Sequence, residues 1–293
     1  MENLEQKTLP LVLISDSGEP QLSCSTAMTV QPNVLLRTGV FTPVGRTKAE
    51  TSIHKDLTEE LRHLEICHKE GYDKVLISGS KLNVETDFRV WCGIILAFSH
   101  YGQYSNEIEL SFAEFARMCG YPARRFDAKL RRQIDASLAR IRGVNLSFQR
   151  RGQVKSSHTG LLHKAKLDET RDIVILLADS DIWDLYTLDF KVLVSMKVLS
   201  ELPRAEVAQC LYLYFLSLPE DPHPISFTRM RERLQLSTPD KEANRRIRLG
   251  IEKLEDVGFV TGFYTHKPGS RETYYKITSR DKKLGRRDIE DLL

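Results

Sequence analysis

Residues 241–260 read KEANRRIRLGIEKLEDVGFV, and their spacing predicts a helix with two unlike faces. Apolar residues recur every three or four positions and therefore share one side of the helix: Ala243, Ile247, Ile251 and Leu254. At about 100° per residue, the cations on the roughly opposite side are Lys241, Arg245 and Arg248. The stretch is therefore either an ordinary solvated helix or a helix that lies along something negatively charged.

The residues around this helix have the order of a winged-helix domain, which is a helix-turn-helix extended by a β-hairpin. A largely apolar helix over residues 205–218 comes first, and a second helix begins at Ser226. Thr238 and Pro239 offer an N-cap and a first helical position to the third helix, which ends at Gly258. The strands FVTGFYT and ETYYKIT then flank the turn HKPGSR, whose tip is basic.

The same order of elements occurs upstream. Residues 87–101 predict a buried helix, and the strand EIEL leads to a second helix that a capping box of Ser111 and Glu114 opens. We expect Pro122 to start a third helix that ends at Gly143 and precedes a hairpin. The apolar stripes of the two third helices align at a shift of 113 positions. We read these regions as two diverged copies of one architecture.

We therefore expect an α+β protein with two tandem winged-helix domains in pseudo-symmetric arrangement and a partly ordered N-terminal extension. The expected boundaries are residues 1–80 for the extension, 82–188 for the first domain, 189–285 for the second domain and 286–293 for a tail. A short amphipathic helix is expected within the extension, at residues 57–70.

Charge is concentrated in these two regions. The whole chain has a formal net charge of only +3, but residues 111–160 hold eleven Lys or Arg against three acids. Residues 226–287 hold sixteen against eight, so each region has an excess of eight positive charges and the remainder is acidic. Two basic regions in an acidic background are typical of two polyanion-binding modules. Two solvated, Arg-rich helical regions are the alternative.

A winged-helix domain places the N-terminal half of its third helix in the major groove of DNA. Arginine can bind guanine through two hydrogen bonds, asparagine can do the same for adenine, and glutamate can accept from cytosine. The candidate base readers of the second domain are therefore Glu242, Asn244, Arg245, Arg246 and Arg248. Arg246 lies off the centre of the polar face and could equally pair with an acid.

Other cations are candidates for contacts with the DNA backbone. In the second domain Lys241 is such a cation. The tip of the wing offers Lys267, Ser270 and Arg271 for contacts with the DNA backbone or the minor groove, whereas Arg229, Arg231 and Arg233 are read as phosphate clamps or solvated charges. The analogous set of the first domain is Arg124, Arg125, Lys129, Arg132 and a wing pair, Arg150 and Arg151. Because few acids offset this set, we expect it to add more salt-dependent backbone affinity than sequence reading.

The sequence contains no pattern that suggests a reaction. The phosphate-binding motif GxxxxGK[ST] is absent, and the eight histidines form neither HxH nor HExxH. The five cysteines form no CxxC pair, and no run of 18 apolar residues or secretory signal is present. We therefore expect a cytoplasmic, non-enzymatic protein with no cofactor, no metal and no membrane association.

Five sequence blocks resemble the RepA-type replication initiators of low-copy bacterial plasmids, most closely the branch of prophage plasmids and the F-type second replicon. The blocks are TVQPNVLLRTGVFTP (29–43), LNVETDFRVWCGIILAFSHYG (82–102), SFAEFARMCGYPARRFDAKLR (111–131), TGLL (159–162) and PISFTRMRERLQL (224–236). The resemblance covers residues from about 29 to 280, and it does not identify the base-contacting side chains.

The resemblance implies a specific function. Such initiators bind repeated origin sequences, called iterons, as monomers, promote melting of adjacent DNA, and recruit the host initiator DnaA, the replicative helicase and chaperones. As homodimers they repress their own gene at an operator in its promoter and limit copy number. The resemblance also implies that the C-terminal domain reads the iteron most strongly and that the N-terminal domain doubles as a dimer interface. Two rivals stay open, a winged-helix transcriptional repressor without a replication role and a strand-nicking initiator.

Overall fold

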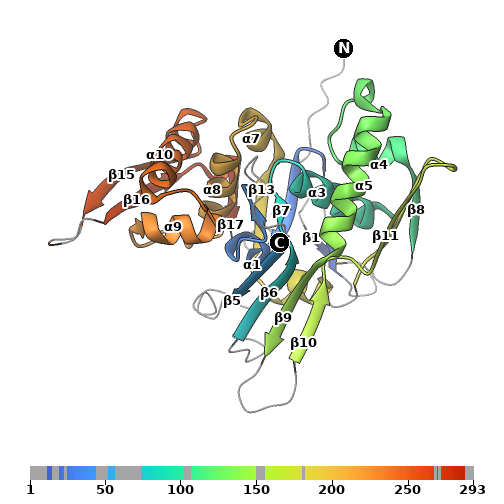
Figure 1. The fold of residues 1–293 in the computed structure, drawn as a ribbon, viewed down its shortest axis with the longest axis horizontal. Coiled ribbons are helices and arrows are strands. Elements are labelled where there is room, and N and C mark those ends of the chain that lie inside the picture. Colours follow the sequence, from blue (N-terminus) through green and yellow to red (C-terminus); the bar gives the residue numbers. More distant parts are fainter. Residues whose placement is uncertain are drawn as a thin grey trace.

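The structure is a computed structural model. It describes residues 12–14, 20–22, 25–43, 52–56, 74–101, 107–149, 156–179, 182–266, 269 and 272–287. The protein is a mixed α/β molecule in which two units, each made of helices and a small sheet, lie on either side of a central set of strands (Figure 1). The helix expected at residues 57–70 lies outside the described residues.

The second unit contains the elements that residues 205–280 predict. In chain order they are α8 (Glu206–Leu216), β14 (Ile225–Ser226), α9 (Phe227–Leu234), α10 (Asp240–Asp256), β15 (Val260–His266) and β16 (Thr273–Arg280). The strands form an antiparallel sheet in the order β14-β16-β15. The predicted apolar stripe of α10 is confirmed, since all four of its members are fully buried: Ala243, Ile247, Ile251 and Leu254.

The first unit repeats this order. Its elements are α3 (Asp87–Tyr101), β8 (Ile108–Ser111), α4 (Phe112–Met118), α5 (Ala128–Arg142), β11 (Lys164–Asp168) and β12 (Ile173–Leu177). The last strand again lies in the middle of the sheet, in the order β11-β12-β8. The second helix is capped alike in both units, because Ser111 Oγ accepts from Glu114 N at 3.2 Å and Ser226 Oγ accepts from Arg229 N at 3.1 Å.

The first unit contains an additional hairpin between α5 and β11. Its strands, β9 (Val144–Gln149) and β10 (Ser156–Gly160), join β6 (Lys74–Ser80) and β5 (Ser52–Asp56) in a separate sheet of order β10-β9-β6-β5. Arg150 and Arg151, the predicted wing pair of this unit, lie outside the described residues, so their place on a wing stays a prediction. Those residues follow β9, whereas the hairpin that pairs with β8 is β11–β12. Alternating burial along β9 marks a strand but does not reveal which sheet it joins.

The third helices begin later than the sequence predicts. Instead of a helix from Pro122, residues Ala123–Arg125 form a short 3₁₀ turn, η2, and Asp127 Oδ1 caps α5 by accepting from Leu130 N at 2.8 Å. The predicted cap at Thr238 is likewise wrong, because α10 begins at Asp240 and the buried Thr238 hydroxyl has no hydrogen-bond partner within the described residues.

A third sheet at the centre joins distant parts of the chain. Strand β13 (Lys191–Ser195) pairs with β3 (Met28–Pro32) on one side and with β17 (Gly285–Arg287) on the other. The remaining elements are β1 (Val12–Ile14), β2 (Pro20–Leu22), α1 (Asn33–Arg37), β4 (Phe41–Thr42), β7 (Leu82–Asn83), α6 (Ile182–Leu188), α7 (Met196–Glu201) and the 3₁₀ turn η3 (Lys282–Leu284). No helix of the described chain is both long and apolar enough to cross a bilayer.

Residues 28–43 contact both units, although the sequence places them in a partly ordered extension. Trp91 Nε1 in α3 donates to Gln31 Oε1 at 2.8 Å, and Arg233 in α9 donates to the Leu36 carbonyl. Val34 and its neighbours are buried in one apolar core that continues into both units. The domain boundaries stay a prediction, but this segment holds the two units together.

Candidate nucleic-acid interface

Helix α10 is fixed by close packing against α8. A Cβ atom on Gly250 would lie 2.9 Å from Leu211 Cδ1 and 3.1 Å from Val207 Cγ1, so the two helices approach closely at this point. The buried stripe of α10 faces this contact, and its polar face is turned to solvent. Lys241 is exposed on that face, without a hydrogen bond or ion pair to any described residue.

Arg245 and Glu242 form an ion pair on the exposed face of α10. Arg245 Nε and Nη2 donate to the two carboxylate oxygens of Glu242, both at 2.8 Å. The Arg245 side chain remains 62% exposed. The hydrogen bonds from Arg245 lower the pKa of the Glu242 carboxyl, and the same contact raises the pKa of Arg245. The two candidate readers therefore act as one group in the free protein.

Asn244 is held by an arginine of the preceding helix. Arg231 Nη1 donates to Asn244 Oδ1 at 2.6 Å, and Arg231 Nη2 donates to Thr228 Oγ1 at 2.8 Å. Arg231 also lies 3.2 Å from a carboxylate oxygen of Asp240. Arg231 is therefore no solvated charge, because it joins α9 to the first turns of α10. The Asn244 carbonyl, which bidentate binding of adenine would need, is already engaged.

Two further arginines of the second unit serve its packing. The guanidinium of Arg248 lies over the rings of Phe227 and Tyr264, 4.9 and 4.7 Å from their centroids. Arg248 thus connects α10 to α9 and β15. Arg233, expected as a phosphate clamp or a solvated charge, is 5% exposed and lies over the ring of Tyr214.

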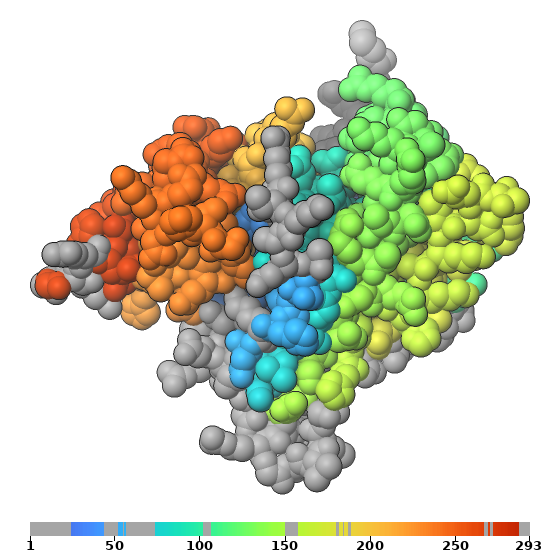
Figure 2. Space-filling view, viewed as in Figure 1, coloured from blue at the N-terminus to red at the C-terminus, as the bar shows by residue number. Residues whose placement is uncertain are grey.

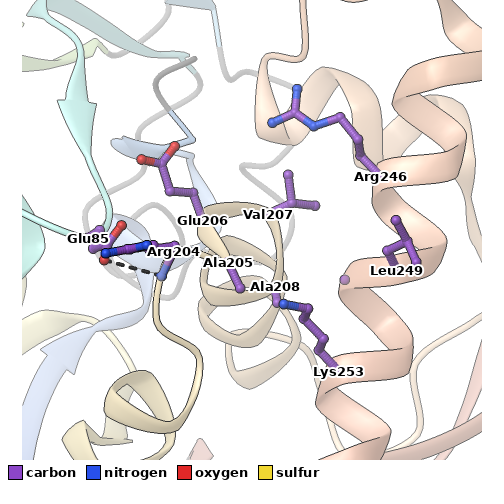
Figure 3. A pocket seen from close by; sticks show the side chains of 10 residues that line it. Glu85, Arg204, Ala205, Glu206, Val207, Ala208, Arg246, Leu249 and Lys253 are labelled. Carbon is purple, nitrogen blue, oxygen red and sulfur yellow. Dashed lines mark hydrogen bonds between the residues drawn. The ribbon is translucent and has the colours of Figure 1, made fainter. Parts of the chain in front are cut away.

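Arg246 projects away from the Lys241 side of α10 and lines a cavity of about 570 Å³. Figure 3 shows Arg246, Leu249 and Lys253 extending from α10 toward the beginning of α8. The acids of this cavity already accept hydrogen bonds: Glu206 from Asn83 Nδ2 at 2.9 Å and Glu85 from Arg204 N at 3.2 Å. No ion pair between Arg246 and an acid occurs among the residues described here.

In the first unit, two of the predicted cations lie on the exposed face of α5. Lys129 and Arg132 are exposed, whereas Arg124 and Arg125 precede the helix in η2. Arg125 lies over the Tyr121 ring, 5.2 Å from its centroid. Figure 2 shows the green surface of this unit and the orange surface of the second unit on opposite sides of the molecular centre.

Two other arginines of α5, Arg131 and Arg140, bind residues of their own unit. Arg131 donates to both carboxylate oxygens of Asp172, at 2.9 and 3.0 Å. Arg140 donates to both oxygens of Asp87, at 2.9 and 2.6 Å, and this carboxylate is completely buried. Hydrogen bonding to Asp87 raises the pKa of Arg140. These arginines hold the unit together.

The residues at the turn of the β11–β12 hairpin are not among those predicted from the sequence. Arg171 lies in this turn and donates to Glu109 on β8 at 2.6 Å. The polar run DETRD, followed directly by the apolar strand IVILL, is the signal that could have identified it. Five predicted residues lie outside the described chain: Lys267, Ser270, Arg271, Arg150 and Arg151. Where residues are described, no cluster of three or more metal-ligating side chains is present.

Comparison with known proteins places the chain in a family, although no protein-family model matches it. It is 41% identical over 284 residues to "Replication protein RepA" of Escherichia coli, covering 96% of this chain and 99% of that protein. It is 39% identical over 262 residues to "RepFIB replication protein A" of Salmonella typhi, covering 87% of this chain and 80% of the relative.

A solved structure shows the same fold. Domains 2 and 3 of RctB align with a TM-score of 0.54 at 13% identity, over 86% of this chain and 99% of that chain. The resemblance of the five sequence blocks to RepA-type initiators is confirmed by the curated relatives. The chain belongs to the RepA family of replication proteins.

Proposed function

We propose that this replication initiator binds repeated sequences of a plasmid origin through two winged-helix domains. The observation that carries the proposal is the repeated unit. In each copy a helix, a strand, two helices and a hairpin follow one another, and the strand pairs with the hairpin in a sheet that has the last strand in its middle. In the second unit, the third helix has a buried stripe on one side and exposed cations on the other. This arrangement suits a helix that enters a major groove.

The two domains make different contacts with DNA. On α10, Arg245 faces the bases and Lys241 contacts a phosphate, because both are exposed near the beginning of the helix. On α5, Lys129 and Arg132 supply contacts with the DNA backbone that depend on salt. Together the two helices occupy successive parts of one repeat.

The proposal also includes the consequences of binding. As a monomer on its repeats, the protein promotes melting of neighbouring DNA and recruits DnaA, the replicative helicase and chaperones. As a dimer on its own promoter, it represses its gene and limits copy number. It acts in the bacterial cytoplasm by binding alone, without a cofactor or a catalysed step. The basis for these steps is the membership of the RepA family.

Footprinting on origin DNA tests the proposal. We expect protection of direct repeats spaced by about two helical turns beside an AT-rich tract. Protection of a lone inverted repeat, with no effect on replication of an origin plasmid, would support the transcriptional repressor instead. Supercoiled origin DNA incubated with the protein and Mg²⁺ should stay uncut, and a relaxed product would favour the strand-nicking initiator.

A further inference from the structure

We propose that Arg245 binds one guanine of the origin repeat and that Glu242 is its positioning residue. This inference rests on the proposed function, in which α10 enters the major groove. It goes further by assigning a base to Arg245 and by giving Glu242 a role other than binding cytosine.

The hydrogen bonds of the pair leave the correct edge of the guanidinium available. Arginine has five N–H donors in a fixed plane. Glu242 takes one from Nε and one from Nη2, which is the side edge of the group. Three donors remain, and two of them, one N–H of Nη1 and one of Nη2, form the end edge. That edge matches the O6 and N7 acceptors of guanine in the major groove.

The other candidates on α10 lack this freedom. Asn244 accepts from Arg231 at 2.6 Å, and Arg248 lies 4.9 Å or less from the centroids of two aromatic rings. Arg246 lines the cavity beside α8. Of the arginines of α10, Arg245 is therefore the one that is exposed on the same face as Lys241 and keeps its end edge out of the hydrogen bonds with Glu242.

Glu242 has two opposite effects on DNA binding in this arrangement. Its negative charge repels phosphates and lowers affinity for any sequence. Its carboxylate also holds the flexible Arg245 side chain in one orientation, so less freedom is lost when the guanine is bound. A positioning residue thus lowers general affinity while it raises discrimination. A merely solvated acid has only the first effect.

The test measures binding of the full chain to three kinds of duplex: the footprinted repeat, a series of repeats in which one G·C pair at a time is changed, and unrelated DNA. For Arg245→Ala, we expect the affinity for the repeat to fall by about tenfold or more, and we expect discrimination at one G·C pair to be lost. For Glu242→Ala, we expect several-fold weaker binding to the repeat but tighter binding to unrelated DNA, with discrimination reduced at the same pair.

Glu252→Ala is the matched control, because Glu252 is an exposed acid of the same helix beyond its N-terminal half. Glu252→Ala should tighten binding to the repeat and to unrelated DNA, without changing discrimination between base pairs. If Glu242→Ala behaves like Glu252→Ala, the positioning role is wrong. If the two variants Arg245→Ala and Glu242→Ala affect different base pairs, the assignment is also wrong. If the unaltered protein does not prefer the repeat, the proposed function fails and this inference with it.

Discussion

The third helices of the two units, α5 and α10, share one framework but use their arginines differently. At the shift of 113 positions that aligns their buried stripes, Arg132 corresponds to Arg245 and Lys129 to Glu242. The second unit thus has an arginine held by an acid, whereas the first has two exposed cations at the same positions. One unit therefore presents a neutral, oriented pair, whereas the other presents two positive charges that form no ion pair with any described residue.

At a second pair of equivalent positions, the cation of the first unit has a partner and the cation of the second unit is exposed. Arg140 in α5 binds the buried carboxylate of Asp87, and the corresponding residue in α10, Lys253, is exposed beside the cavity. In the first unit the later arginine, Arg140, binds a buried carboxylate, whereas in the second unit we propose that the early arginine, Arg245, binds DNA. The number of arginines on a helix therefore does not predict its function, because the role of each guanidinium depends on the residue that it contacts.

The largest effect should follow from breaking the pair in the first unit. Arg140→Ala leaves Asp87 buried, with hydrogen bonds from Ser137 Oγ at 2.6 Å and Asn83 N at 2.8 Å but without a counter-charge. Because Arg140 is itself partly exposed, we expect a loss of about 2–4 kcal/mol in the free energy of unfolding. Urea denaturation measures it. The control Lys253→Ala should change stability by less than about 0.5 kcal/mol, and equal losses would contradict the comparison.

The next effect concerns the equivalent arginines. Arg245→Ala should lower the binding free energy of the origin repeat by about 1–3 kcal/mol and relax discrimination at one position. Arg132→Ala should instead weaken binding to all sequences similarly and lower the salt slope by about one. Fluorescence anisotropy titrations over a range of salt concentrations compare the two variants. A sequence-specific loss for Arg132→Ala would show that both helices read bases.

Local patterns predicted much of this architecture. The apolar period of α10, the helix at Asp87–Tyr101, the serine cap at Ser111 and the beginning of a helix at Ser226 depend on residues a few positions apart, and all are present. The additional hairpin was misread because β9 pairs with β6, a strand that lies far upstream. Only tertiary contacts could reveal this pairing.

The contacts of the candidate site residues also could not be predicted without the structure. Sequence spacing placed Arg245, Arg246 and Arg248 on one helix, but it could not show their different partners. Arg248 packs against aromatic rings from two other elements, and Arg246 lines a cavity formed with α8. The pairing of Arg245 with Glu242 was accessible from sequence, because an i, i+3 spacing brings opposite charges together on a helix.

Exchanging the acid between the units would sharpen the comparison. Lys129→Glu lowers the net charge by two and places a carboxylate three residues before Arg132, as Glu242 stands before Arg245. We expect weaker binding to all DNA, with the salt slope reduced by about two. Glu242→Lys should increase the slope by about the same amount and lose discrimination. Titrations on repeat and unrelated DNA measure both variants, and an unchanged slope for Lys129→Glu would place α5 away from DNA.

The smallest effect is expected for Arg246→Ala. Arg246 was a candidate base reader, but it projects toward the cavity between α10 and α8. Removing its charge should weaken binding to every duplex slightly, by less than about 0.5 kcal/mol, and should leave base discrimination intact. Anisotropy titrations on the singly changed repeats measure this. If discrimination falls at one base pair, α10 lies in the groove rotated toward the cavity, and Arg246 rather than Arg245 reads that base.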